Sequence, residues 1–195
     1  MTVGIIEYNA GNIQSVQFAL QRLGVTPVFS RDPEVLTKTD RLIFPGVGEA
    51  SSAMQFLRQA GLDTLITFYR RPFLGICLGL QLMSEYSEEN DTPGLGIFPV
   101  TVRRFPPRDK VPHIGWNTIG SLQGPLFRGI VEPSYVYFVH SYYAALSEFT
   151  VATTEYILPF SAALHRDNYW AVQFHPEKSG TVGERILRNF LELNS

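Results

Sequence analysis

Residues 73–81 read Phe-Leu-Gly-Ile-Cys-Leu-Gly-Leu-Gln, and this stretch decides how the chain is expected to fold. Residues 73–76 form a short apolar run that predicts a buried strand, and a helical stretch follows through about residue 85. Between them, residues 75–79 have the form Gly-x-Cys-x-Gly. This is the pattern of a nucleophile elbow, a sharp strand-to-helix turn in which glycines avoid a Cβ clash. The sequence therefore predicts that Cys77 lies at the carboxyl end of a strand and at the start of a helix.

The residues before this turn alternate between strand and helix. We expect strands at 3–8, 25–29 and 42–44 and helices at 13–23, 50–60 and 62–70. Asn12 is the expected N-cap of the first helix, and Gly24 ends that helix. Such alternation favours a parallel sheet with helices on both of its faces.

The residues after the turn follow a different pattern, because residues 100–175 are rich in β-branched and aromatic side chains. Strands are expected at 135–139, 162–165 and 170–174, with a tight hairpin at 166–168 and a closing helix near 181–193. We therefore predict an α/β fold with a mostly parallel central sheet flanked by helices and an additional antiparallel β region in the second half. No Pro/Gly/Ser-rich linker divides the chain, so a single domain spanning residues 1–195 is expected.

Composition excludes several classes of protein. The 195 residues are 45% hydrophobic and 17% charged with a net charge of −2, which argues against wholesale disorder and against nucleic-acid binding by bulk charge. The only cysteine, Cys77, cannot form an intramolecular disulfide, so a reducing, cytoplasmic compartment is expected. The least charged window near the middle, residues 72–84, is too short to cross a bilayer. Residues 94–96 (Gly-Leu-Gly) lack the third glycine of a dinucleotide fingerprint, so we expect no nucleotide cofactor. A zinc site of several cysteines is excluded by the cysteine count, and we expect no metal.

Cys77 becomes a candidate nucleophile through its setting, although a lone cysteine is more often a small core residue. A helix N-terminus favours a thiolate, and a thiolate nucleophile needs a base and a group that orients the base. Of the four histidines, only His175 has an acid at a useful spacing near the end of a strand, namely Glu177 in Gln-Phe-His-Pro-Glu. Residues i and i+2 of a strand share a face, so Glu177 is expected to bind one imidazole nitrogen of His175. His165 is expected at the surface.

A second loop, Pro-Gly-Val-Gly at residues 45–48, also follows a predicted strand and should reach the same end of the sheet. Acyl transfer requires two N–H donors for the oxyanion. We predict the Leu78 amide as one donor and an amide at Val47 or Gly48 as the other.

The complete pattern resembles the class I (triad) glutamine amidotransferases, and within them the glutaminase subunits of imidazole glycerol phosphate synthase. The resemblance rests on Gly-Ile-Cys-Leu-Gly-Leu-Gln at 75–81 and His-Pro-Glu at 175–177, and on several further segments. These are Tyr-Asn-Ala-Gly-Asn at 8–12, Pro-Gly-Val-Gly at 45–48, Lys-Val-Pro-His-Ile-Gly-Trp-Asn at 110–117, Tyr-Phe-Val-His-Ser-Tyr-Tyr at 137–143 and Gln-Phe-His-Pro-Glu-Lys-Ser at 173–179.

The resemblance implies a flavodoxin-like amidotransferase fold and a glutaminase reaction. Cys77 attacks the carboxamide of L-glutamine, His175 moves the proton, Glu177 orients His175, and a thioester is hydrolysed to glutamate. Ammonia passes to a (β/α)₈-barrel cyclase in a heterodimer of histidine biosynthesis. The implied glutamine-binding residues are Gly46, Gln81, Glu89, Ser141 and Tyr142, and the implied cyclase-facing residues are Asn12, Trp116 and Lys178.

Val47 suggests how the glutaminase activity of such a subunit is kept low without its partner. A β-branched residue resists positive φ, so the resting loop is expected to present a carbonyl rather than an amide at the oxyanion site. Binding of the partner and its nucleotide would shift this population, and the chain alone would be weakly active.

Small departures from the family pattern leave the triad intact. Glu7 and Asn9 stand where Asp and Gly are more frequent, and Leu80 replaces a common Met. Three alternatives remain open. They are a glutaminase subunit of another synthase (anthranilate or pyridoxal phosphate synthesis), a stand-alone cysteine hydrolase, and a binding subunit without catalytic activity.

Overall fold

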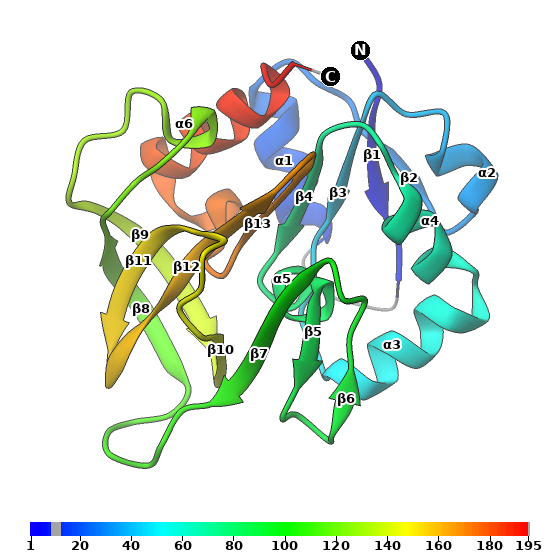
Figure 1. Cartoon of the computed structure of the whole chain (residues 1–195). Helices are drawn as coiled ribbons and strands as arrows, with labels where there is room; N and C mark the ends of the chain where they lie inside the picture. Colours follow the sequence, from blue (N-terminus) through cyan, green and yellow to red (C-terminus); the bar gives the residue numbers. More distant parts are fainter. Residues whose placement is uncertain (9–12, 195) are drawn as a thin grey trace.

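A twisted seven-stranded sheet runs through the part of the chain that the computed structural model describes, residues 1–8 and 13–194 (Figure 1). Its strand order is β11-β12-β13-β4-β3-β1-β2. The last five of these strands are mutually parallel, whereas β11 and β12 pair antiparallel at one edge. The strands span β1 (Val3–Ile6), β2 (Val28–Ser30), β3 (Arg41–Phe44), β4 (Phe73–Ile76), β11 (Thr150–Tyr156), β12 (Leu158–Arg166) and β13 (Tyr169–Val172).

Helices cover both faces of this sheet, as Figure 1 shows. They are α1 (Ile13–Arg22), α2 (Pro33–Leu36), α3 (Ala50–Gln59), α4 (Leu62–Phe68), α5 (Leu78–Met83) and α6 (Gly180–Leu191). Apolar side chains of α1 and α6 belong to one buried cluster, and those of α2, α3, α4 and α5 belong to a second. Strand β4 contributes Leu74 and Ile76 to the first cluster and Phe73 to the second. Because successive strand residues point to opposite faces, a strand covered on both faces must be apolar throughout.

The second half of the chain adds two smaller sheets. A four-stranded sheet has the order β10-β7-β5-β6, and β8 pairs antiparallel with β9, within the described residues. These strands span β5 (Ser84–Ser87), β6 (Thr92–Pro93), β7 (Phe98–Arg104), β8 (His113–Ile119), β9 (Ser134–His140) and β10 (Tyr142–Ala144). Two single 3₁₀ turns, η1 (Pro125–Phe127) and η2 (Pro176–Lys178), lie before β9 and α6.

The predicted α/β class is confirmed, including the antiparallel region in the second half. The hairpin at 166–168 is also confirmed, because Arg166 pairs with Tyr169 across a two-residue loop in which Asp167 has φ 54°. The helix expected through residue 85 is wrong at its end, because α5 stops at Met83 and residues 84–87 form β5. The first strand ends at Ile6 rather than residue 8, and the second spans Val28–Ser30 rather than 25–29.

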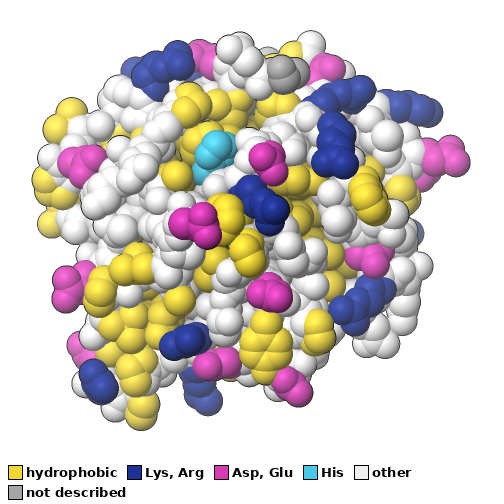
Figure 2. Space-filling view, in the orientation of Figure 1, with side chains coloured by type: hydrophobic (Ala, Val, Ile, Leu, Met, Phe, Trp, Pro, Cys, Tyr) yellow, Lys and Arg dark blue, Asp and Glu magenta, His cyan; other side chains and the backbone are white. Residues whose placement is uncertain are grey.

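Charge is dispersed on the face of the molecule drawn in Figure 2, where Lys and Arg side chains alternate with Asp and Glu. No helix in the described part of the chain is long and apolar enough to cross a membrane.

Candidate active site

Cys77 lies in the sharp turn that the elbow pattern predicts. It follows β4, occupies the N-cap position of α5, and has φ 54° and ψ −106°. Its N–H donates to the Val172 carbonyl at 2.8 Å, which ties the turn to β13. A β-carbon at Gly79 would lie 2.2 Å from the Phe44 carbonyl oxygen, and one at Gly75 would lie 2.4 Å from the Met83 sulfur. Both glycines are therefore required by the close approach of α5 to the sheet.

His175 and Glu177 are in contact as predicted, but the backbone that joins them is a 3₁₀ turn and not a strand. Nδ1 of His175 lies 2.8 Å from Oε1 of Glu177, and both side chains are buried. The prediction that they occupy a strand is wrong, because β13 ends at Val172 and Glu177 belongs to the 3₁₀ turn η2. Pro176 has no N–H for strand pairing, and its restricted φ suits the first position of a helical turn.

Ser179 holds this turn in place. The Ser179 hydroxyl donates to the His175 carbonyl at 2.6 Å and accepts from the Tyr137 N–H at 2.9 Å. The His175 N–H in turn donates to the Tyr137 carbonyl at 2.8 Å. The backbone that carries the imidazole is thereby fixed to β9.

The charge state of His175 depends on its neighbours. Burial is the largest single influence and lowers the pKa of His175, but the Cys77 sulfur and the Glu177 carboxylate outweigh it and raise the pKa to about 10. Nε2 of His175 is buried, and no atom of the described residues meets ordinary hydrogen-bonding geometry with it, although Cys77 is close enough to raise its pKa. The Cys77 thiol instead points to the Val139 carbonyl, with Sγ and O 3.7 Å apart. This arrangement favours a sulfur and imidazole pair able to exchange a proton.

A cavity of about 300 Å³ opens beside Cys77. Eight residues predicted for the site line it, namely Val47, Gly48, Cys77, Leu78, Gln81, Glu89, Ser141 and Tyr142. His175, Glu177 and Gly46 do not line it. His175 and Glu177 are buried, and a β-carbon added at Gly46 would meet the Tyr8 hydroxyl. The volume lies within the range that suits a small polar ligand.

The predicted oxyanion donors Leu78 and Val47, the latter one of two alternatives for the second donor, are not both available in this conformation. The Leu78 N–H donates to the Gly46 carbonyl at 3.3 Å. That carbonyl shares a planar trans peptide with the Val47 N–H, so the Val47 N–H points in the opposite direction. The loop therefore presents an oxygen where an oxyanion would need a donor.

Gln81 and Glu89 line the cavity but already have partners. The Gln81 amide donates to the Tyr142 carbonyl at 3.0 Å and to the Gln173 amide oxygen at 3.3 Å. Glu89 accepts from the Ala50 N–H at 2.8 Å, at the start of α3. Burial and the nearby Glu49 raise the pKa of Glu89 against the effect of that hydrogen bond.

Sequence reasoning missed four residues near the nucleophile. Gln173 donates to the Cys77 sulfur at 3.7 Å, and Pro112, Val139 and His140 line the cavity. Val139 ends the predicted strand 135–139, and His140 follows it immediately before Ser141, which is the local signal that could have identified them.

Two of the three residues predicted to face a partner lie together. Trp116 is 53% exposed and packs its ring edge-on against Tyr137, with centroids 6.0 Å apart. The Lys178 ammonium lies 6.0 Å from the centroid of the same Tyr137 ring. The third, Asn12, lies outside the described residues, as does its predicted role as N-cap of α1.

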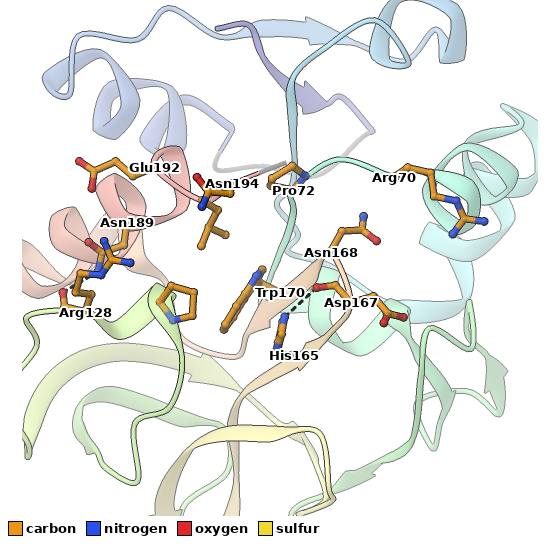
Figure 3. A pocket seen from close by; sticks show the side chains of 12 residues that line it. Arg70, Pro72, Arg128, His165, Asp167, Asn168, Trp170, Asn189, Glu192 and Asn194 are labelled. Atoms are coloured by element: carbon orange, nitrogen blue, oxygen red, sulfur yellow. Dashed lines mark hydrogen bonds between the residues drawn. The ribbon is translucent and has the colours of Figure 1, made fainter.

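A second, larger cavity of about 380 Å³ lies at the opposite end of the sheet (Figure 3). Figure 3 shows Trp170 between residues of the α6 end and the hairpin residues His165 and Asp167. The Asn168 and Asn189 amides there donate to backbone carbonyls, so these polar groups serve the fold. His165, predicted at the surface, is half-buried and stacks on Trp170 at 3.7 Å.

No group of three or more His, Cys, Asp or Glu side chains in residues 1–8 and 13–194 is arranged to hold a metal ion.

Comparison with known proteins gives a consistent result. Residues 5–193 match the family described as glutamine amidotransferase class-I. A relative from Bacteroides fragilis strain YCH46, named imidazole glycerol phosphate synthase subunit HisH, is 59% identical over 99% of this chain and 100% of its own length. A relative of the same name from Yersinia pseudotuberculosis is 46% identical over the same shares.

Solved structures agree on the fold. One titled as a glutamine amidotransferase superposes with a TM-score of 0.77 at 22% identity, covering 98% of each chain. A glutamine amidotransferase from Thermotoga maritima superposes with a TM-score of 0.67 at 18% identity, covering 98% of this chain and 83% of that one. With an elbow cysteine, a buried His–Glu pair and a match over nearly the whole sequence, the chain belongs to the class-I glutamine amidotransferase family.

Proposed function

We propose that this chain is the glutaminase subunit of an imidazole glycerol phosphate synthase, acting as one domain of residues 1–195 in the cytoplasm. The observation that carries the proposal is the convergence of Cys77, His175 and Glu177 from two distant segments beside one small cavity. The 59% identity to a relative of that name over almost the whole chain supports the choice of synthase. A single cysteine without a disulfide suits a reducing compartment.

The proposed reaction follows from the three side chains. The thiol proton of Cys77 moves to His175 Nε2 before the attack, and Cys77 Sγ then attacks the side-chain carbonyl carbon of L-glutamine. The tetrahedral intermediate expels the amine, which takes that proton and leaves as ammonia, so that a glutamyl thioester remains on Cys77. Water then attacks the thioester carbon while His175 removes a proton and returns it to the departing sulfur. Glutamate is released, and Glu177 keeps the imidazole oriented throughout.

The conformation of the 45–48 loop predicts that the isolated chain has low glutaminase activity. As long as the Gly46 carbonyl accepts from the Leu78 N–H, the Leu78 and Val47 amides cannot both donate to an oxyanion at Cys77. Rotation of the 46–47 peptide would free the Leu78 amide and bring the Val47 amide to the site. We infer that partner and nucleotide binding favours this rotated state.

The surface around Trp116, Tyr137 and Lys178 is the proposed docking site for the (β/α)₈-barrel cyclase. The Lys178 N–H donates to the His175 carbonyl at 3.0 Å, so this surface and the catalytic imidazole share one turn. A docking event at Lys178 is therefore mechanically close to the catalytic residues. Asn12 remains a predicted member of this surface.

The test is release of glutamate from glutamine by the purified chain, alone and with a cognate cyclase plus its nucleotide ligand. We expect weak activity alone, strong stimulation in the complex, and no activity for Cys77→Ala under either condition. Activity that survives Cys77→Ala would refute the assigned nucleophile. Strong activity without the partner would point instead to a stand-alone hydrolase.

A further inference from the structure

Two buried histidines next to the candidate site have no role in the reaction described above. His113 begins β8 and His140 ends β9, and the two residues face each other as a cross-strand pair. Their exposed fractions are only 3% and 6%. Nδ1 of His113 lies 3.0 Å from Nε2 of His140. Direct contact between two buried imidazoles leaves few ways to place their protons.

The hydrogen-bond partners determine those proton positions. Nδ1 of His140 lies 2.7 Å from the Tyr142 carbonyl, and a carbonyl only accepts, so Nδ1 of His140 must carry a hydrogen. In a neutral ring Nε2 is then an acceptor, which requires Nδ1 of His113 to donate to it. Nε2 of His113 is consequently an acceptor as well, and the Asn117 amide nitrogen lies 3.4 Å from it. Both rings are thus assigned the Nδ1–H tautomer.

Asn117 anchors the outer end of this chain of hydrogen bonds. Its amide nitrogen donates to the Glu155 carbonyl at 2.9 Å, and its oxygen accepts from the Thr118 N–H at 2.8 Å. These two backbone contacts fix the orientation of the amide. Only a nitrogen is therefore available to face His113.

The surroundings keep both rings uncharged. His113 stacks between Phe138 and Tyr156 at centroid distances of 4.8 and 4.1 Å, and His140 packs against Phe105 at 5.3 Å. Burial lowers the pKa of His113 to about 4 and that of His140 to about 3. At neutral pH the pair acts as a rigid, neutral, directional donor.

His140 donates this hydrogen bond to the Tyr142 backbone, which forms part of the cavity wall. The Tyr142 carbonyl accepts from both His140 Nδ1 and the Gln81 amide, so both of its lone pairs are used. Ser141 and Tyr142 line the cavity, and the Ser141 carbonyl accepts from the Phe105 N–H at 3.1 Å. The backbone at 141–142 is fixed at each carbonyl, with His140 as the side chain that ties it to β8 and β9.

We propose that His140, backed by His113, is a positioning residue that holds the backbone of residues 141–142 for binding of the amino-acid end of glutamine. This inference rests on the proposed glutaminase function. Because the pair touches neither the sulfur nor the imidazole of the triad in any hydrogen bond, its loss should weaken substrate binding and leave the chemical step nearly intact.

The first test compares three variants as complexes with the cyclase and its nucleotide ligand. His140→Phe keeps an aromatic ring but removes both nitrogens, and with them the hydrogen bonds to the Tyr142 carbonyl and from His113. Loss of the bond that holds Tyr142 should raise KM for glutamine about tenfold, with kcat changed less than about threefold. In His140→Asn the amide nitrogen falls near the position of Nδ1 and can still donate to Tyr142, so KM should stay within about threefold of wild type. His165→Asn removes a histidine stacked on an aromatic ring at the other end of the sheet and should change neither constant.

Equal KM increases in His140→Phe and His140→Asn would overturn the proposal, because packing alone would then explain them. A fall in kcat at unchanged KM would also overturn it. If the wild-type complex produces no glutamate, the proposed function fails instead, which separates the two failures.

A second test needs no variant and is independent of activity. Nitrogen-15 NMR of the wild-type histidines at pH 7 should show His113 and His140 as neutral rings with hydrogen on Nδ1, the less common tautomer. A signal from hydrogen on Nε2 of His140 would refute the assigned hydrogen bond to Tyr142, even if His140→Phe failed to fold.

Discussion

At the scale of single residues, Cys77 is held in a backbone conformation that side chains with a β-carbon rarely adopt, at φ 54°. The surroundings compensate for this strain, since its N–H bonds to β13 and two glycines admit the turn. The same turn places the sulfur 3.7 Å from the Val139 carbonyl oxygen and close enough to His175 to raise the pKa of that imidazole. Local instability and the candidate chemistry therefore have one physical origin.

Glu177→Gln tests the orienting carboxylate. The substitution keeps the size of the side chain but replaces an anionic acceptor 2.8 Å from Nδ1 by an amide, which allows the wrong tautomer of His175. We expect kcat in the complex to fall by about 10²- to 10⁴-fold with little change in KM. Glu184→Gln is the control, because Glu184 is an exposed acid paired with Arg188 on α6 and should leave kcat unchanged. Equal effects of both substitutions would contradict the role of Glu177.

The titration of His175 tests its coupling to Cys77. Folding raises the pKa of His175, so its protonated form stabilises the fold fully below the ordinary value of 6.5, and this stabilisation is lost as pH rises through about 10. NMR titration of the wild type should show a protonated His175 at pH 8. In Cys77→Ala the pKa should fall, because one of the two groups that raise it is absent. An unchanged titration in Cys77→Ala would show that Glu177 alone sets the pKa.

At the scale of elements, the end of α5 shows where local pattern and tertiary structure disagree. The helical pattern in the sequence continues through about residue 85, yet Ser84 begins β5, and β5 pairs with β6 and β7. The Ser84 hydroxyl donates to the Leu80 carbonyl at 3.1 Å, which satisfies an acceptor in the last turn of α5. The β7 residues that pair with β5 lie at 98–102, so the sequence pattern of α5 contains no information about this pairing.

Gly79→Ala tests the packing of α5 on the sheet. An added β-carbon would lie 2.2 Å from the backbone oxygen of Phe44, the last residue of β3. This clash could be relieved only by moving α5 away from β3. We expect the free energy of unfolding, measured with denaturant, to fall by about 1–3 kcal/mol. Gly120→Ala is the matched control, since the nearest atom to its added β-carbon would be a Glu132 carboxylate oxygen at 3.4 Å, an ordinary van der Waals distance. A Gly79→Ala protein as stable as Gly120→Ala would mean that α5 packs less tightly than described.

At the scale of the whole molecule, the turn that follows His175 and the proposed partner surface are one structural unit. η2 carries Glu177 and Lys178, follows His175 directly, and is tied to β9 through Ser179. A partner that presses on Lys178 or Tyr137 acts on the backbone that positions the imidazole. If the proposed docking site is correct, this arrangement would give a physical route from docking to activity.

Trp116→Ala tests that surface. Trp116 is half exposed, and a large aromatic side chain of this kind serves as an anchor in protein interfaces. We expect the affinity for the cyclase, measured by calorimetry, to fall by about 30-fold, equivalent to about 2 kcal/mol. Phe68→Ala on α4 removes an aromatic side chain that is 65% exposed, and it should leave the affinity unchanged. Loss of affinity in Phe68→Ala alone would place the interface elsewhere.

The sequence by itself determined the α/β class, the elbow at Cys77 and the pairing of His175 with Glu177. These features depend on near neighbours in the chain, such as glycines two residues from Cys77 or an acid two residues from His175, so local pattern was sufficient. Tertiary structure alone decided the 3₁₀ geometry of η2, the end of α5, the Gly46 carbonyl at the Leu78 amide and the His113–His140 pair. Each of these joins groups whose contact or orientation depends on how separate elements pack together. The free energy that selects such contacts comes from burial in the assembled fold, which no short stretch of sequence contains.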